Sequence, residues 1–207
     1  NDKLLENDAQ VRINSLSDYM MRQLYLNTDG TEINSDISRI YYVYVIGVSD
    51  GGNYDQTSDE FGYTGGYEAL KKAGIPEKMR DDASSLKESL QAPAVNPGIF
   101  DVIAGPKISG IVAHESSGHP MEYDRIIGRE GALAGESFLT GKEYPFRIGS
   151  DNVSVIDDPT IDGSFGYYRY DEECIPARKR YLYRKGYTDE FLLNRESAAI
   201  IGKEPNG

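Results

Sequence analysis

The feature that most constrains the fold is a break near the middle of the chain, at Pro93-Ala94-Val95-Asn96-Pro97-Gly98. Because proline lacks an amide donor and fixes φ, this stretch excludes a continuous helix or a central strand. The 207 residues suffice for one large hydrophobic core or two small ones. We therefore predict two parts, residues 1–92 and residues 98–207. We also expect both ends, at Asn1 and Gly207, to be cut from a longer protein.

The residues before the break favour strands followed by helices. Tyr, Val, Ile and Thr are concentrated from Val11 to Phe61, and turn residues stand at 27–30 and 49–52. Helix formers follow from Tyr67 to Ala73 and from Asp81 to Leu90. We interpret residues 1–92 as the C-terminal part of an N-terminal α+β domain, with the helices covering one face of a sheet.

The residues after the break begin with a helix and continue into a β-rich region. We expect a strand at Ile99–Ala104 and then a helix from about Ile108 whose Ile108, Ile111 and Val112 face inward. Residues 128–141 are glycine-rich and are interpreted as a loop. Further strands are expected at Val153–Ile156 and Arg178–Arg184.

Both histidines of the chain lie at the end of that helix, in Ala113-His114-Glu115-Ser116-Ser117-Gly118-His119-Pro120, a HExxxH pattern. Neutral imidazoles are good zinc ligands, and a carboxylate beside the first can take a proton from metal-activated water. We therefore predict that His114 and His119 bind zinc and that Glu115 is the general base. The alternative is a capped core residue at His114 and a helix-terminal cation at His119.

The spacing of the two histidines requires an irregular backbone. Positions i and i+5 lie about 140° apart around an α-helix, whereas positions i and i+4 lie about 40° apart. A regular helix would therefore point His114 and His119 in different directions. For both to reach one ion, the backbone has to bulge or unwind, and we expect Gly118 and Pro120 to supply the irregularity.

Composition narrows the function and the fold class. The formal net charge of −12 repels nucleic acid phosphates and anionic lipid, so neither is an expected partner. The single cysteine, Cys174, cannot form an internal disulfide, and no run of apolar residues suggests a membrane span, so we expect a cytoplasmic protein. The expected fold class is α+β: an N-terminal sheet with covering helices, the metal-binding helix, and a largely antiparallel β region.

The sequence around the histidines resembles the TldD/PmbA family of metallopeptidases, also called modulators of DNA gyrase. The similarity is strongest from Gly110 to Pro176 and covers the segment Ile108–Asp124 almost position by position. Downstream, Val153–Pro159 and Gly163–Gly166 resemble the family's valine-rich strand, paired aspartates and glycine turn.

The resemblance implies a zinc peptidase of the HExxxH type that acts on extended or unfolded peptides. It also implies a homodimer, or a heterodimer with a homologous subunit that lacks the motif. In the family the third zinc ligand is a cysteine of a later C-terminal domain, which would lie beyond residue 207. Cys174 stands where the family usually has glycine, so the ligand role is not assigned to it, and we interpret it as a small buried hydrophobe.

Several charged residues near the motif have two interpretations. Glu122 and Asp124 could orient an imidazole or form a solvated helix end. Arg125 and Arg129 could hold a substrate carboxylate or pair with nearby acids. A further acidic group lacks the ligand alternation of an EF-hand and is interpreted as a turn and a polar strand edge rather than a calcium site; it comprises Asp157, Asp158, Asp171, Glu172 and Glu173.

The expected function is that of a zinc-dependent metallopeptidase in which Glu115 activates water. Two other functions stay open. One is a non-catalytic subunit that binds peptide or regulates a partner. The other is a hydrolase acting on a different bond, because a HExxxH pattern specifies activated water and not the substrate.

Overall fold

The structure is a computed structural model that describes residues 9–129 and 136–207. These residues form two compact units. The first comprises residues 9–24, 32–99 and 162–167, and the second comprises residues 25–31, 100–129, 136–161 and 168–207. Each unit has its own hydrophobic core.

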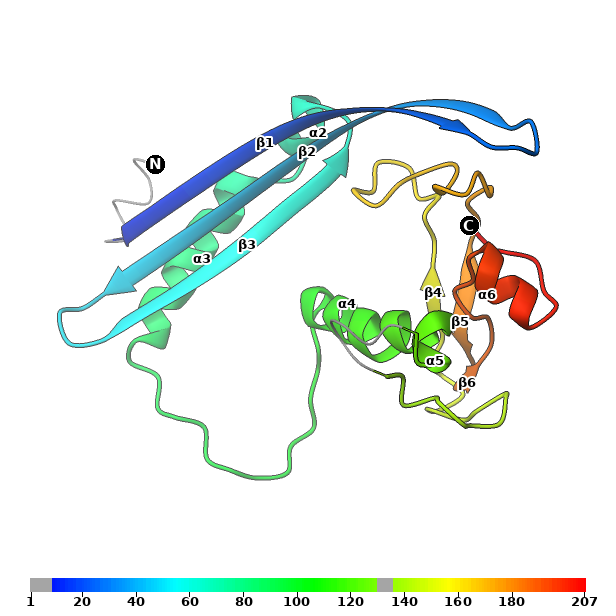
Figure 1. Ribbon diagram of the computed structural model, residues 1–207. Helices are drawn as coiled ribbons and strands as arrows, with labels where there is room; N and C mark the ends of the chain where they lie inside the picture. The colour runs from blue at the N-terminus through cyan, green and yellow to red at the C-terminus, as the bar shows by residue number, and fades with distance from the viewer. Residues whose placement is uncertain (1–8, 130–135) are drawn as a thin grey trace. The chain divides into compact units, whose positions relative to one another are not determined.

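The first unit is built on a three-stranded sheet in the order β1-β2-β3 (Figure 1). Its strands are β1 (Ala9–Leu26), β2 (Glu32–Ser49) and β3 (Tyr54–Thr64). β2 and β3 pair antiparallel, with Arg39 opposite Thr64 and Ser49 opposite Tyr54. The strands expected between Val11 and Phe61 are therefore confirmed.

Both expected turns are present between these strands. The side chain of Asn27 accepts hydrogen bonds from the backbone of Asp29 and Thr31, and Gly30 has φ 83°. The side chain of Asp50 accepts from the backbone of Gly52 and Asn53 in the second turn. Such Asx contacts explain why these residue types mark the chain reversals in the sequence.

Helices α2 (Tyr67–Lys71) and α3 (Ile75–Ser89) follow β3, and α3 lies along one face of the sheet (Figure 1). α3 begins well before the expected Asp81, because Gly74 adopts φ 62° and Pro76 suits the first turn of a helix. The buried side chains of β2 and α3 form the core of this unit, namely Ile40, Tyr44, Ile46, Val48, Ile75, Met79, Ala83 and Leu86.

The second unit combines short helices with an antiparallel sheet in the order β4-β5-β6. The helical elements are α4 (Pro106–Ala113), η1 (His114–Gly118), η2 (His119–Met121), α5 (Tyr123–Ile126) and α6 (Arg195–Ile200). The strands are β4 (Val155–Asp157), β5 (Arg180–Arg184) and β6 (Tyr187–Thr188). The predicted α+β class, with its antiparallel second region, is confirmed.

Two expectations after the break are wrong. Residues 98–105 form no strand, and Ile99 and Ile103 are fully exposed, because no described strand pairs with this segment. Ile108, Ile111 and Val112 do not face inward, since each side chain is 51–56% exposed. Of the predicted loop 128–141, residues 130–135 lie outside the described chain. No helix among the described residues is both long and apolar enough to cross a membrane.

Candidate metal centre

The helix that carries the two histidines widens at the motif. α4 is a regular α-helix, η1 is a five-residue π-helix, and η2 is a short 3₁₀-helix. The amide of His119 donates a hydrogen bond to the carbonyl of His114, which closes a turn of five residues. A π-type turn brings residues i and i+5 to the same side, so the predicted departure from a regular helix is present and has the required effect.

Glycine does not have to use its conformational freedom in this turn. Gly118 has φ −57° and ψ −72°, which other residues also adopt. A Cβ atom placed on Gly118 would lie 3.9 Å from His114 Nδ1, an ordinary contact. Pro120 follows at the start of η2 and is buried. Of the two residues expected to cause the irregularity, only Pro120 therefore has a clear physical role, because it has no amide to continue the helix.

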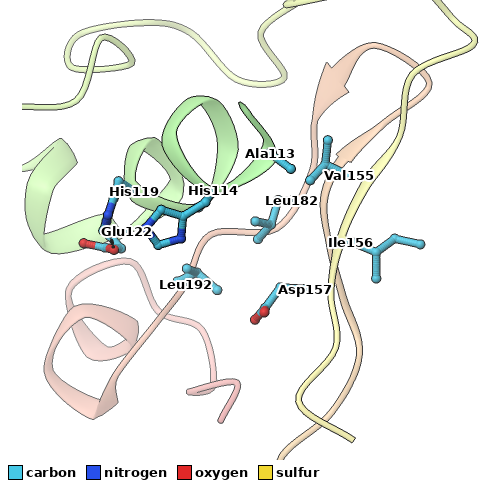
Figure 2. Close-up of a pocket in the computed structure, with 10 residues that line it drawn as sticks. Ala113, His114, His119, Glu122, Val155, Ile156, Asp157, Leu182 and Leu192 are labelled. Atoms are coloured by element: carbon cyan, nitrogen blue, oxygen red, sulfur yellow. Dashed lines mark hydrogen bonds and ion pairs between the residues drawn. The ribbon is translucent and has the colours of Figure 1, made fainter. Parts of the chain in front are cut away.

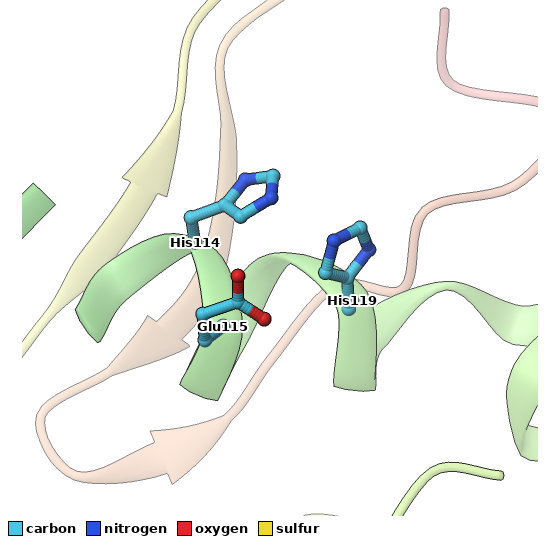
Figure 3. A group of neighbouring side chains, drawn as sticks. All are labelled: His114, Glu115 and His119. Carbon is cyan, nitrogen blue, oxygen red and sulfur yellow. The ribbon is translucent and has the colours of Figure 1, made fainter. Parts of the chain in front are cut away.

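The π-type turn from His114 to His119, called the wide turn below, brings three potential metal ligands together. One ligand atom each from His114, Glu115 and His119 lies within 4.8 Å of the others. The two imidazole rings lie edge to face, with their centroids 4.4 Å apart. Figure 3 shows Glu115 on the same stretch of helix as the two rings. Within residues 9–129 and 136–207, this is the only group of three such side chains close enough to hold a metal ion.

A carboxylate orients the second histidine. His119 Nδ1 lies 2.7 Å from Glu122 Oε1, and the other oxygen of Glu122 accepts a hydrogen bond from Arg125 Nε. If Nδ1 carries the proton, Nε2 is left with its lone pair available for a metal. Metal-binding histidines commonly donate their other ring N–H to a carboxylate in this way. Glu122 therefore has the contact expected of an orienting residue.

The contacts of Asp124, Arg125 and Arg129 favour the simpler of the two interpretations given for each residue from the sequence. The Asp124 carboxylate accepts a hydrogen bond from the backbone amide of Arg125. Arg125 pairs with Glu122, and Arg129 pairs with the exposed Glu196. The arginines thus pair with nearby acids.

The acidic residues considered for calcium form turns, except that Asp157 forms an ion pair with Arg180. Asp158 accepts hydrogen bonds from Thr160, which lower the pKa of its carboxyl. Asp171 accepts from the amides of Glu173 and Ile175 in a turn that also contains Cys174. Cys174 is only half-buried, at φ 65°, and not fully buried as expected, and it does not belong to the ligand group of the described chain.

The histidines face a cavity of about 260 Å³ in the second unit, between the helix and the sheet (Figure 2). One wall comes from the end of α4 and the wide turn, and the opposite wall comes from β4 and β5. The lining residues are Ala113, His114, Gly118, His119, Glu122, Val155, Ile156, Asp157, Leu182 and Leu192. The cavity therefore opens onto the two histidines of the ligand group.

The side chains present fit a zinc ion. Zinc accepts imidazole nitrogen and carboxylate oxygen as ligands, and structural and catalytic zinc sites differ in whether a position stays open. His114 and Glu115 are exposed and His119 is half-buried, so the group can be reached from solvent. Two histidines that converge beside a carboxylate can hold a metal and place a base next to it.

Fold and ligand group together define an α+β protein with a candidate zinc site, and comparison with known proteins gives its family. Residues 97–207 match the family described as PmbA/TldA metallopeptidase C-terminal domain. Residues 1–89 match the central domain of the same proteins. The chain belongs to the PmbA/TldA metallopeptidase family.

Individual relatives agree with this assignment. A metalloprotease of Methanothermobacter thermautotrophicus is 36% identical over 183 residues, which cover 88% of this chain and 38% of the relative. A zinc metalloprotease TldD homolog of Saccharolobus solfataricus is 24% identical over 196 residues, covering 92% of this chain and 41% of the relative. This chain therefore spans about two fifths of the length of these relatives.

Solved structures share the fold. The crystal structure of a proposed modulator of DNA gyrase from Bacteroides thetaiotaomicron superimposes with a TM-score of 0.72. The alignment covers 99% of this chain and 47% of that chain, at 18% sequence identity. At this identity the likeness shows the fold alone.

Two residues of the site are not apparent from the sequence. Asp157 lines the cavity and pairs with Arg180, although its pattern indicates only a turn or strand edge. Tyr183 reaches the wide turn from β5, and nothing in its sequence surroundings distinguishes it from the other tyrosines. Both contacts depend on how the sheet packs against the helix, which no local spacing encodes.

Proposed function

We propose that this chain carries the zinc site of a metallopeptidase that cleaves extended or unfolded peptides. His114 and His119 would hold the metal, and Glu115 would be the general base. The observation that supports this most strongly is the five-residue turn, because it gathers both imidazoles and the carboxylate into one group whose two histidines line a cavity. The metalloprotease and zinc metalloprotease descriptions of the relatives point to the same chemistry.

The side chains have distinct parts in the proposed reaction. A zinc ion held by the histidines would polarise the scissile carbonyl and lower the pKa of water. Glu115 takes the proton of the attacking water and delivers it to the nitrogen of the leaving amine. Glu122 holds the His119 ring in one orientation through its contact with Nδ1.

The shape of the cavity supports an extended substrate. β4 is at the end of its sheet, and Val155, Ile156 and Asp157 all line the cavity. A peptide in extended conformation can lie along such an edge strand and use its own backbone for hydrogen bonds. A folded protein cannot present its backbone in this way, so unfolded segments are the preferred substrate class.

Two histidines alone would bind zinc weakly, and we propose a third protein ligand. The family resemblance implies a cysteine of the C-terminal domain, beyond residue 207. The same resemblance supports a homodimer, or a heterodimer with a homologous subunit. Metal content of a full-length protein and of this 207-residue chain, measured side by side, tests the position of that ligand.

The test of the proposed function is Glu115→Gln in a full-length protein that carries this chain. We expect zinc content to stay near that of the wild type and peptide cleavage to fall by about 10²- to 10⁴-fold, since the variant lacks a base but keeps both imidazoles. His114→Ala is the matched control and should lose the metal as well as the activity.

Three outcomes would count against parts of the proposal. Cleavage by Glu115→Gln at the normal rate would show that this carboxylate is not the base. Loss of zinc from Glu115→Gln would make Glu115 a ligand instead. Peptide binding by the wild type without zinc-dependent turnover would favour the non-catalytic subunit.

A further inference from the structure

We propose that Tyr183 is a positioning residue that holds the wide turn open for metal binding, an inference that rests on the proposed zinc site. Tyr183 lies on β5 and is 3% exposed. Its hydroxyl donates a hydrogen bond of 2.6 Å to the backbone carbonyl of Ser116. Ser116 is inside the turn whose two ends are His114 and His119.

The Ser116 carbonyl accepts a hydrogen bond from outside the helix, at the point where a regular α-turn cannot continue. In an α-helix a carbonyl accepts from the amide four residues further on. For Ser116 that residue is Pro120, which has no amide hydrogen. The hydroxyl of Tyr183 supplies the bond that Pro120 cannot give.

The donor is held rigidly. β5 is the middle strand of its sheet, and Tyr183 pairs with Val155 of β4 and with Thr188 of β6. The ring belongs to the second hydrophobic core, together with Met121 and Leu182. Burial raises the pKa of Tyr183, with a smaller opposing contribution from the Ser117 hydroxyl, so the phenol keeps its proton at neutral pH.

The acceptor side of the contact is fixed as well. The Ser116 hydroxyl donates to the carbonyl of Val112 at 2.5 Å, a back-bond that bends helices. The Ser117 side chain is fully buried. The turn is therefore attached to α4 on one side and to the sheet on the other.

This attachment links the ligand group to the opposite wall of the cavity. Val155, the strand partner of Tyr183, lines the same cavity as His114 and His119. Without the phenol, the Ser116 carbonyl has to find water or a different helical partner, and the five-residue spacing of the imidazoles is no longer enforced. Partners that orient metal ligands typically change affinity by about 10- to 100-fold when removed.

The experiment compares Tyr183→Phe with the wild type in a full-length protein. The measurements are the dissociation constant for Zn²⁺, by competition with a chelator, and the visible absorption spectrum with Co²⁺ in place of zinc. We expect zinc affinity to fall by about 10- to 100-fold and the cobalt bands to shift. Tyr181→Phe is the matched control, because the Tyr181 hydroxyl makes no hydrogen bond to another described residue of the chain.

Pro120→Ala in the Tyr183→Phe background separates positioning from general stability. An alanine amide can donate to the Ser116 carbonyl and make the helix regular, so we expect the thermal stability of the metal-free protein to recover while zinc affinity stays low. If zinc affinity returned together with stability, Tyr183 would be merely structural.

The remaining outcomes distinguish this inference from the proposed function. Wild-type affinity and an unchanged cobalt spectrum in Tyr183→Phe, with metal lost from His114→Ala, would overturn the role of Tyr183 and leave the zinc site intact. A wild-type protein that binds neither zinc nor cobalt would overturn the zinc site, and the role of Tyr183 with it.

Discussion

Glu122 connects one candidate metal ligand to a cation. One of its oxygens contacts His119 and the other accepts from Arg125, whose side chain is only 11% exposed. The carboxylate is thereby held in place before any metal arrives. A ligand that is already oriented loses less conformational entropy on binding than one that rotates freely.

Removing the negative charge of this carboxylate should weaken the site. We expect Glu122→Gln to lower zinc affinity by about 10- to 100-fold, because the amide orients the imidazole less strongly and makes it less basic. The neighbouring Asp124→Asn is the control, since the Asp124 carboxylate accepts a hydrogen bond from the backbone amide of Arg125 and not from an imidazole. Equal affinities of Glu122→Gln and the wild type, by chelator competition, would contradict this role.

At the residue scale the sequence predicts those groups whose chemistry depends on spacing. His114, Glu115 and His119 follow from one motif, and the structure gathers them into one group. Asp157 and Tyr183 contribute to the same site through contacts between strands and helix. Their partners are 23 and 67 residues away in the sequence, so no local pattern could identify them.

The wide turn is the element that brings the side chains of the motif together. Its geometry could be predicted in outline, because five-residue spacing cannot converge on a regular helix. Its cause differs from the expected one in part, since Gly118 has a φ that any residue can adopt. By contrast, Gly186 in the β5–β6 turn has φ 79°, and a Cβ there would lie 2.4 Å from the Gly149 carbonyl oxygen.

The two glycines should therefore respond in opposite ways to alanine. We expect Gly118→Ala to raise the free energy of unfolding by up to about 1 kcal/mol, because alanine restricts the unfolded chain at a compatible site. Gly186→Ala should lower it by more than that, through strain and the clash. The midpoint of urea unfolding measures both, and destabilisation of equal size in the two variants would be inconsistent with the described turn.

One strand expected after the break is absent from the residues that the structure describes, although the strands expected at Val153–Ile156 and Arg178–Arg184 correspond to β4 and β5. The apolar run Ile99–Ala104 has the composition of a strand but forms none in the described chain. A strand requires a partner for its backbone hydrogen bonds, whereas a helix satisfies its own. β4 and β5 find each other, and the segment 98–105 has no described partner.

For the molecule as a whole, the division into two units separates the candidate metal centre from the larger sheet. All residues of the ligand group and its cavity belong to the second unit. A ligand that binds only the folded state stabilises the region that has to be ordered to bind it. Zinc should therefore act locally.

Hydrogen exchange with and without zinc tests this in a full-length protein. We expect slower exchange in α4, the wide turn and β5, by up to the roughly 2.7 kcal/mol that a hundredfold excess over the dissociation constant supplies. Amides of β2 and α3 should be unchanged and are the internal control. Protection of equal size in both units would show that they respond to zinc as one.

The five-residue turn also has a genetic consequence. Loss of a single codon between His114 and His119, such as that of Ser116, would restore the four-residue spacing with which a regular helix can present two ligands. Because the π-type turn already brings His119 to the side of His114, the deletion would remove the extra residue and leave the side chains after it close to their present directions. Met121, which is fully buried, would keep its place in the core. In this fold the longer and the shorter motif therefore differ by one codon and need no repacking behind them.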